Sequence, residues 1–199
     1  MRLSPEARAL VSPADVFRGL AGGRGGGAWL LARRPLALLL AMGSTVSILA
    51  GGRLTARLVV DGAISFAFIP SFEIAALAVV LRRIPRRVPL AQAVDVVFTA
   101  NGPWILWMLA ASTIASIAGP EELPRWTSRP RLYFVAAATA IAIAWFVRLE
   151  LSAFRWALER TRREAISDVA LHRALAWPAA AVYFFAFALW PMIVGMLRR

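Results

Sequence analysis

The stretch AISFAFIPSFEIAALAVVL, residues 63–81, decides the fold class of this chain. Its 19 residues contain a single charged side chain, Glu73. About 20 consecutive apolar residues form a helix long enough to cross the roughly 30 Å hydrocarbon core of a bilayer. Four further stretches of this kind occupy residues 35–52, 90–119, 132–151 and 174–197, and none alternates polar and apolar residues as a membrane β-strand does. The sequence therefore predicts an all-α polytopic membrane helical bundle with five transmembrane helices.

The composition agrees with a membrane protein. Of the 199 residues, 60% are hydrophobic and 17% are charged, and the mean hydropathy is +0.66. Soluble domains have about 45–50% apolar and about 25% charged residues. The chain has no cysteine, which excludes disulfides and iron–sulfur clusters, and one histidine, His172, which excludes bis-histidine haem ligation. No phosphate-binding glycine loop or hydrolase motif is present, so we expect neither a cofactor nor an enzymatic activity.

All 23 basic residues are arginines, and most lie at the ends of the apolar stretches. With five spans, 16 arginines fall on the side of the N-terminus and 7 on the other side. Because positive residues resist translocation, the N-terminus is predicted to be cytoplasmic, in the inner membrane of the cell. Guanidinium groups pair with phosphate, so anionic lipid headgroups, and not nucleic acid, are the expected partners. The candidate lipid contacts are Arg33, Arg34, Arg82, Arg83, Arg86, Arg87, Arg155, Arg160, Arg162 and Arg163.

Two parts of the chain are predicted. Residues 1–34 form a cytoplasmic N-terminal tail, because they contain a short amphipathic segment after Pro13 and a glycine-rich hinge at 22–27 but no apolar centre of a secretion signal. Residues 35–199 form the five-helix transmembrane domain. Within that domain, we expect the basic connection at 148–173 to continue the fourth helix along the membrane surface.

Small residues recur at every fourth position, as in Gly43, Ser47 and Gly51 of the first span. This spacing places them on one helix face, where two helix backbones can approach closely. We expect this face to pack within the bundle. Contacts with other membrane proteins, or with a second copy of the chain, are the alternative.

Polar residues inside the apolar stretches are the candidate functional residues. Glu73 lies near the middle of the second stretch, Gln92 and Asp95 lie in the first turns of the third, and Arg148 lies in the last turns of the fourth. An ionised side chain in hydrocarbon must be paired, neutralised or hydrated. We therefore expect a polar network of these residues and Asn101, in which Arg148 pairs with Glu73 or with Asp95. Such a network either fixes the helix packing or conducts protons or cations.

The third stretch is interrupted by Asn101, Gly102 and Pro103. Pro103 removes a backbone hydrogen bond, Gly102 loosens the helix, and Asn101 can bond the freed carbonyls. Two arrangements remain open. Residues 88–100 form an amphipathic helix on the cytoplasmic side that leads into a shorter span, or one long helix bends at this point.

The order of these features resembles the Yip1-like family of multi-pass integral membrane proteins. The similar features are a Pro-x-x-x-Phe element from Pro13 to Phe17, the Arg-Arg-Pro sequence at 33–35 that opens the first span, and Phe98 followed by Gly-Pro-Trp at 102–104. The resemblance implies a five-helix integral membrane protein. In eukaryotic members it implies roles in vesicle trafficking and contact with small GTPases. It carries over no functional residue to this chain.

Functions of different classes follow from these features. We predict first a non-enzymatic membrane scaffold or partner-binding subunit, because no catalytic pattern is present. The alternative is a small proton- or cation-coupled transporter component that uses Glu73 and Asp95. A third reading, an enzyme acting on lipid, requires a polar cavity at the cytoplasmic leaflet in which Arg148 faces a carboxylate.

Overall fold

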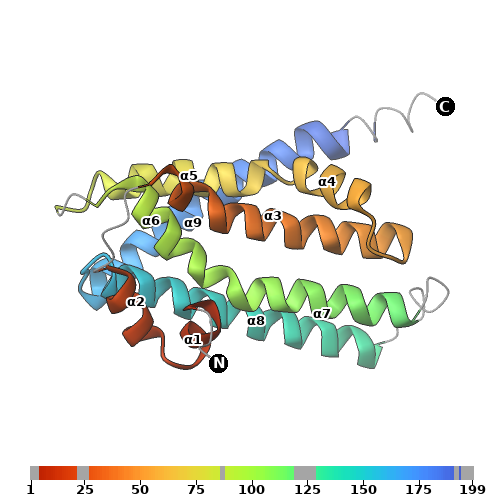
Figure 1. The fold of residues 1–199 in the computed structure, drawn as a ribbon, viewed down its shortest axis with the longest axis horizontal. Coiled ribbons are helices and arrows are strands. Elements are labelled where there is room, and N and C mark those ends of the chain that lie inside the picture. Colours follow the sequence, from red (N-terminus) through yellow and green to blue (C-terminus); the bar gives the residue numbers. More distant parts are fainter. Residues whose placement is uncertain (1–4, 22–26, 86–87, 119–128, 191–192, 194–199) are drawn as a thin grey trace.

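The computed structural model describes residues 5–21, 27–85, 88–118, 129–190 and 193. Every regular element in this part of the chain is helical, which confirms the predicted all-α class (Figure 1). The elements are α1 (Pro5–Val11), α2 (Pro13–Ala21), α3 (Ala28–Gly51), α4 (Ala56–Ser65), α5 (Phe68–Leu81), α6 (Leu90–Phe98), the 3-10 turn η1 (Thr99–Asn101), α7 (Gly102–Ala118), α8 (Arg129–Trp156), α9 (Arg162–Phe184) and the π-helical turn η3 (Phe185–Leu189).

Five helical stretches of the described chain are long and apolar enough to cross a membrane, as the sequence predicts. They are Ala28–Gly51, Ala56–Leu81, Leu90–Ile117, Leu132–Trp156 and Arg162–Phe187. In the most apolar part of the third stretch, 56% of the residues are buried, which is the largest share among the five. The third stretch is therefore the central helix of the bundle. Large apolar side chains on the others are exposed, for example Leu40, Ile141 and Phe187, as expected for surfaces that face lipid tails.

The closest helix crossing lies between α3 and α4. A β-carbon added at Gly43 would lie 2.0 Å from the carbonyl oxygen of Val59, and one added at Gly62 would lie 3.0 Å from the Cα of Gly43. Only glycines leave room for this contact. One turn further on, Ser47 is buried and its Oγ donates to the Arg53 carbonyl at 2.8 Å, which closes the turn between the two helices. The small-residue face of the first span therefore packs within the bundle.

The second span consists of two helices joined at Phe66 and Ala67. Pro70 explains the break, because proline lacks an N–H and its ring clashes with the carbonyl four residues earlier, that of Phe66. The backbone tightens at this point, since the Ala67 N–H donates to the Ile64 carbonyl at 3.1 Å and the Ile69 N–H donates to the Phe66 carbonyl at 3.0 Å. The first half of this span, α4, lies against α3, and the second half, α5, lies against α9.

The third span bends where Asn101, Gly102 and Pro103 interrupt it. Its two helices, α6 and α7, are joined by η1, and residues 93–101 are all buried. The residues Leu90–Ile117 form one candidate span with a bend at η1, which agrees with the second of the two expected arrangements.

The fourth connection differs from the expected surface segment at 148–173. Helix α8 ends at Trp156, and α9 begins at Arg162 rather than near residue 174. The start of α9 is set by a capping box: Thr161 Oγ1 accepts from the Glu164 N–H, and the Glu164 carboxylate accepts from the Thr161 N–H. Residues 148–156 and 162–173 therefore belong to the fourth and fifth long helices.

The N-terminal helices α1 and α2 pack against one end of the bundle (Figure 1). Phe17 of α2 is fully buried against Val96 of α6 and Ala153 and Ala157 at the end of α8. The guanidinium of Arg18 lies 4.1 Å from the ring centroid of Trp156. The part of the predicted tail that spans residues 5–21 is thus packed on the helices, whereas most of the predicted glycine hinge lies outside the described residues.

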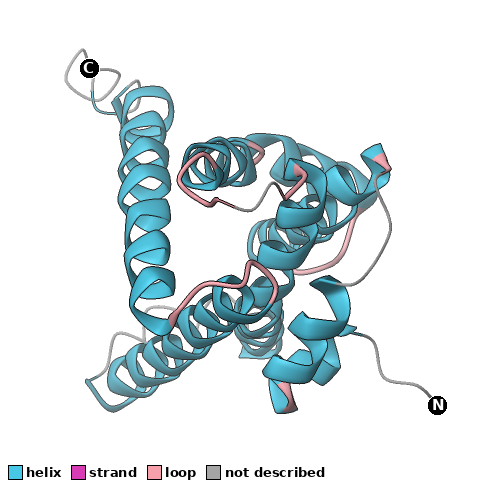
Figure 2. Cartoon of the chain, turned by 90° about the vertical axis from the view of Figure 1, so that its left-hand side faces the viewer, coloured by secondary structure: helices cyan, strands magenta, loops and turns pink. Residues whose placement is uncertain are grey.

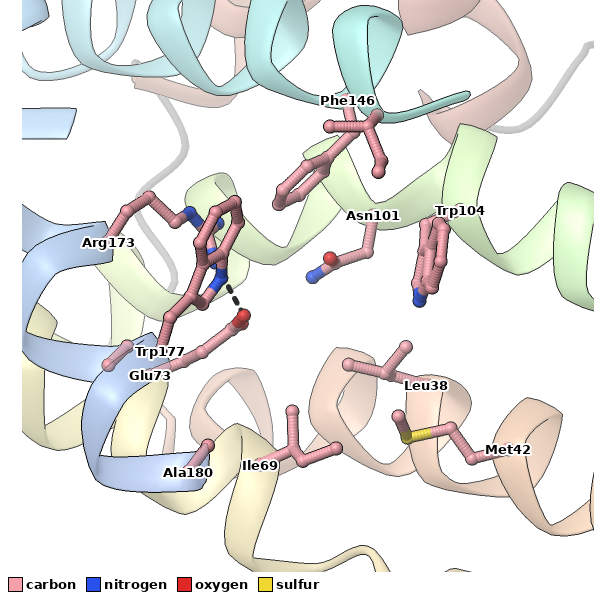
Figure 3. A pocket seen from close by; sticks show the side chains of 12 residues that line it. Leu38, Met42, Ile69, Glu73, Asn101, Trp104, Phe146, Arg173, Trp177 and Ala180 are labelled. Carbon is pink, nitrogen blue, oxygen red and sulfur yellow. Dashed lines mark hydrogen bonds and ion pairs between the residues drawn. The ribbon is translucent and has the colours of Figure 1, made fainter. Parts of the chain in front are cut away.

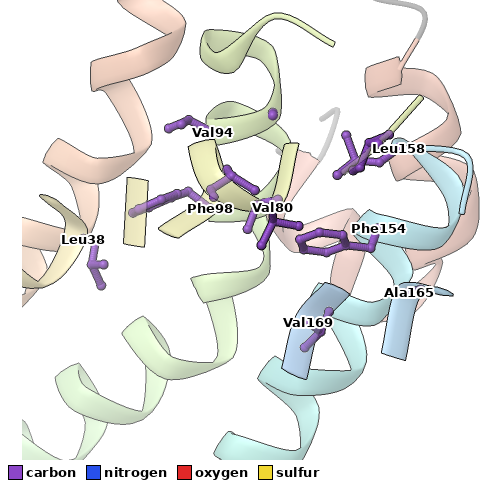
Figure 4. Packing of buried hydrophobic residues seen from close by; sticks show 12 residues of the cluster. Leu38, Val80, Val94, Phe98, Phe154, Leu158, Ala165 and Val169 are labelled. Carbon is purple, nitrogen blue, oxygen red and sulfur yellow. The ribbon is translucent and has the colours of Figure 1, made fainter. Parts of the chain in front are cut away.

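The main apolar core lies at the same end of the molecule. Leu77 and Val80 of α5, Phe98 of α6, Phe154 of α8 and Val169 of α9 form its centre (Figure 4). In the end-on view of Figure 2, the helix that leads to the C-terminus lies at the edge of the group. Its last turns, from Val182 to Phe187, are exposed. The core therefore fixes α5, α6, α8 and α9 at one end and leaves α9 more loosely enclosed beyond it.

We expect Gly43→Ala to destabilise the bundle by about 1–3 kcal/mol, because the new methyl group overlaps the α4 backbone. Gly19→Ala in α2, where an added β-carbon meets nothing within 4 Å, should change stability by less than about 1 kcal/mol and in the stabilising direction. Both are measured as SDS-induced unfolding of the protein in mixed micelles, followed by circular dichroism. Equal effects of the two substitutions would contradict the assigned crossing.

Candidate functional site

Glu73 of α5 is buried and paired with an arginine of α9. Arg173 Nη1 donates to Glu73 Oε1 at 2.6 Å, and both side chains are more than nine-tenths buried (Figure 3). Helix α5 lies alongside α9, which brings the two residues together although they are 100 positions apart. The carboxylate expected to need a partner within the bundle has one.

Arg173 also binds a second carboxylate, that of Glu150 in α8. Its Nε donates to Glu150 Oε2 at 2.8 Å, and its Nη2 lies 2.8 Å from Glu150 Oε1. This two-pronged contact matches the planar guanidinium to the planar carboxylate. The guanidinium also lies 4.5 Å from the centroid of the Phe146 ring, which contributes a cation–π contact. Arg173 therefore ties α5 to α8 from its position on α9.

His172 completes the cluster. Its Nδ1 lies 2.7 Å from Glu150 Oε1, and its Nε2 lies 3.0 Å from the backbone carbonyl oxygen of Glu73. His172 and Glu150 are fully buried. We call these four residues, Glu73, Glu150, His172 and Arg173, the buried network.

The buried network lies at one depth in the bundle. Glu73 precedes the end of α5 by roughly 12 Å, Glu150 precedes the end of α8 by roughly 9 Å, and His172 follows the start of α9 by roughly 15 Å, at 1.5 Å per residue. These three helix ends lie at the same end of the molecule (Figure 1). The network is therefore inside the span region and below the apolar core that closes this end.

A cavity of about 300 Å³ opens beside Glu73 (Figure 3). Most of its wall is apolar and is supplied by all five spans; Leu38, Met42, Ile69, Ile143, Phe146, Ala176 and Ala180 are examples. Polar groups on the wall come from Glu73 and Arg173 of the network, from Asn101 of η1, and from the indoles of Trp104 and Trp177. A mostly apolar cavity with a few convergent polar groups is the usual form of a small-molecule site.

Two polar groups of this wall lack protein partners. Glu73 Oε2 is buried and makes no hydrogen bond to any described residue. The side-chain amide of Asn101, which is 4% exposed, makes none either within the same part of the chain. An unpaired buried oxygen of a carboxylate is costly, so such an atom in a cavity marks a position where a donor from outside the protein would bind.

Asp95 belongs to a second, separate cluster. Its carboxylate accepts from Arg33 Nε and, at 2.6 Å, from Arg33 Nη2, and Arg34 Nε lies 3.1 Å from its Oδ1. Arg34 Nη1 also donates to the Asp95 backbone carbonyl at 2.7 Å. Both carboxylate oxygens are thus engaged, and the pair joins α3 to α6. Asp95 has no open position for a ligand.

The predicted polar network is therefore only partly assembled. Glu73 and Asn101 line one cavity, whereas Asp95 and Gln92 lie on α6 outside it. Arg148, expected to pair with Glu73 or Asp95, is exposed on α8, because Arg173 and the pair Arg33 and Arg34 take those positions. Sequence reasoning missed Glu150, His172 and Arg173. The signal that could have found them is the Thr-x-x-Glu capping box at 161–164, which predicts that a helix starts there and carries residues 172 and 173 into the bundle.

The ten arginines predicted to contact lipid headgroups fall into three groups: paired with a carboxylate, outside the described residues, or exposed. Arg33 and Arg34 bind Asp95, and Arg160 Nε donates to Asp168 at 2.8 Å. Arg86 and Arg87 lie outside the described residues. The remaining five are exposed, with guanidinium groups available to headgroups: Arg82, Arg83, Arg155, Arg162 and Arg163.

Other kinds of site find no support in the described residues. No three His, Asp or Glu side chains among them lie together in a way that could hold a metal ion. Comparisons with protein-family models, with curated proteins and with solved structures find no match to this chain. The resemblance to the Yip1-like family accordingly stays a prediction from the sequence.

We expect Arg173→Gln to destabilise the protein by about 3–5 kcal/mol, because it leaves two carboxylates buried without their cation. Arg148→Gln on the exposed face of α8 should change stability by no more than about 0.5 kcal/mol. Unfolding by SDS in mixed micelles measures both. A loss for Arg148→Gln as large as for Arg173→Gln would show that the ion pairs are wrongly assigned.

Proposed function

We propose that this chain is an integral membrane protein that binds a small, largely apolar molecule with a polar head in the cavity beside Glu73, and that it acts as a carrier or a carrier subunit for such molecules. The observation that carries the proposal is the unpaired Glu73 Oε2, buried on the wall of an apolar cavity next to the free amide of Asn101. A molecule that donates a hydrogen bond to this oxygen and buries its apolar part against Leu38 and Met42 fits both features.

This proposal favours the second of the functions expected from the sequence over the scaffold. A scaffold requires only that its polar groups be satisfied within the bundle, as those of Asp95 are. Glu73 departs from that pattern, because it lines the cavity and its Oε2 has no hydrogen-bond partner among the described residues. The enzyme reading is not favoured, since Arg148 is exposed and does not face a carboxylate in the cavity.

We further propose that the end of the bundle formed by α1, α2 and the α8–α9 turn faces the cytoplasm at the inner membrane. Exposed arginines lie directly after α5, on α2 and on the two sides of the α8–α9 turn, and these segments share one end of the molecule (Figure 1). This distribution is typical of the cytoplasmic side and suits contacts with anionic headgroups. The cavity then lies in the half of the membrane nearer the cytoplasm.

Ligand binding is tested by photolabelling with a small alkyl diazirine alcohol, which has an apolar body and one hydroxyl donor. We expect labelling of cavity residues, Glu73 and Met42 among them, to be mapped by mass spectrometry of the protein in nanodiscs. Ala180→Phe, which fills the cavity, should abolish this labelling, whereas Ala179→Phe on the neighbouring position outside the lining should retain it. Labelling spread over the lipid-facing surface and unchanged by Ala180→Phe would refute the proposed site.

The orientation is tested with two single cysteines, since the natural chain has none to interfere. Ser12→Cys lies exposed between α1 and α2, and Arg53→Cys lies exposed in the turn between α3 and α4 at the opposite end. In intact cells, a membrane-impermeant maleimide should label only the cysteine at 53, and both should be labelled after permeabilisation. The reverse pattern would place the N-terminus outside.

A further inference from the structure

The hydrogen bonds of His172 require a proton between it and Glu150. The Glu73 backbone carbonyl can only accept, so His172 Nε2 carries a hydrogen and donates to it at 3.0 Å. On the other side of the ring, Nδ1 lies 2.7 Å from Glu150 Oε1. A proton between these two atoms removes the repulsion between their lone pairs, so the pair holds one proton while the cavity contains no cation, and that proton is bonded to the nitrogen or to the oxygen.

With this proton the buried network is electrically neutral. Glu73 and Glu150 contribute two negative charges, and Arg173 and the shared proton contribute two positive charges. Neutrality matters here because an unbalanced charge inside the span region is expensive. Other charges nearby are balanced separately: Asp95 of α6 by Arg33 and Arg34 of α3, and Asp168 of α9 by Arg160.

The cavity offers a second position for that positive charge. Glu73 lines it and has an Oε2 without a partner among the described residues, and the indole ring of Trp104 lines the same space (Figure 3). A carboxylate oxygen together with an aromatic ring is a common arrangement for an ammonium ion, since the ring face attracts cations. Arg173 connects this oxygen to the shared proton, because it binds Glu73 on one side and Glu150 on the other.

We infer that the cavity takes an organic monocation of the ammonium type, and that this cation, on binding at Glu73, releases the proton shared by His172 and Glu150. The inference rests on the proposed ligand-binding function and specifies its ligand and its coupling. One cation enters the cavity and one proton leaves the protein. The N–H or O–H bond that holds the shared proton breaks, and the proton passes to bulk water. The network together with its bound cation therefore stays neutral. A neutral ligand with a hydroxyl group fills the same cavity without displacing the proton.

The test uses benzyltrimethylammonium, whose charge is permanent, so that every proton released comes from the protein. Its binding to the protein in nanodiscs is measured by calorimetry in two buffers with different ionisation enthalpies, which gives the number of protons released. We expect about one proton per cation bound, and about a tenfold tighter affinity for each unit rise in pH while the network holds its proton. The neutral probe 2-phenylethanol should bind with no proton release and no such dependence on pH.

Variants separate the role of Glu73 in binding the cation from the role of His172 in holding the proton. Glu73→Gln should weaken cation binding at least tenfold and leave 2-phenylethanol binding within about threefold, whereas Asp61→Asn, at an exposed carboxylate of α4, should change neither. His172→Gln should bind the cation without releasing a proton. Binding of 2-phenylethanol to each variant verifies that its cavity has formed.

Each outcome bears on one proposal. Cation binding without proton release and without pH dependence in the wild-type protein, or binding of 2-phenylethanol alone, would overturn this inference and leave the ligand-binding function standing. If neither probe binds, and the diazirine alcohol does not label the cavity, the proposed function itself fails.

Discussion

The structure depends on one constraint, that the charges buried between helices in the described part of the chain are paired with opposite charges. Lipid tails are as apolar as leucine side chains, so apolar contact alone gives helices in a membrane little reason to choose one neighbour over another. Here the ion pairs make that choice. Arg173 joins α5, α8 and α9, and Asp95 joins α3 to α6. The close crossing at Gly43 then adds α4, and the apolar core around Phe98 and Phe154 fills the space between the paired helices.

The two charged clusters differ in how completely their carboxylate oxygens are paired. Asp95 has both carboxylate oxygens bound by arginines, so its role in the fold is complete. In the buried network, both oxygens of Glu150 are bound, whereas Glu73, which lines the cavity, has one oxygen without a partner among the described residues. An unsatisfied buried acceptor of this kind costs of the order of 1–3 kcal/mol.

Hydropathy predicted the helices well because each apolar stretch is a local property of the chain. The all-α class, the five stretches and the bend at Asn101 could all be derived in this way. The fifth helix was placed too late for a physical reason. Its first half, residues 162–173, is rich in polar residues, of which Asp168, His172 and Arg173 are buried against protein and the others are exposed. A hydropathy average cannot distinguish a polar residue facing protein from one facing water. The choice of partner for Glu73 depends on which helices are neighbours, and one sequence does not contain that information directly.

The second span is divided at Phe66 and Ala67 into two halves that pack against different helices. One half of this span is held by α3 through the glycine crossing, and the other half is held by α9 through the salt bridge to Arg173. The backbone between the two halves is not a continuous α-helix, so the α3–α4 hairpin and the α5–α9 pair are joined along the chain through this tightened turn. The cavity spans the joint, because Leu38 and Met42 on its wall come from α3 whereas Glu73 and Arg173 come from α5 and α9.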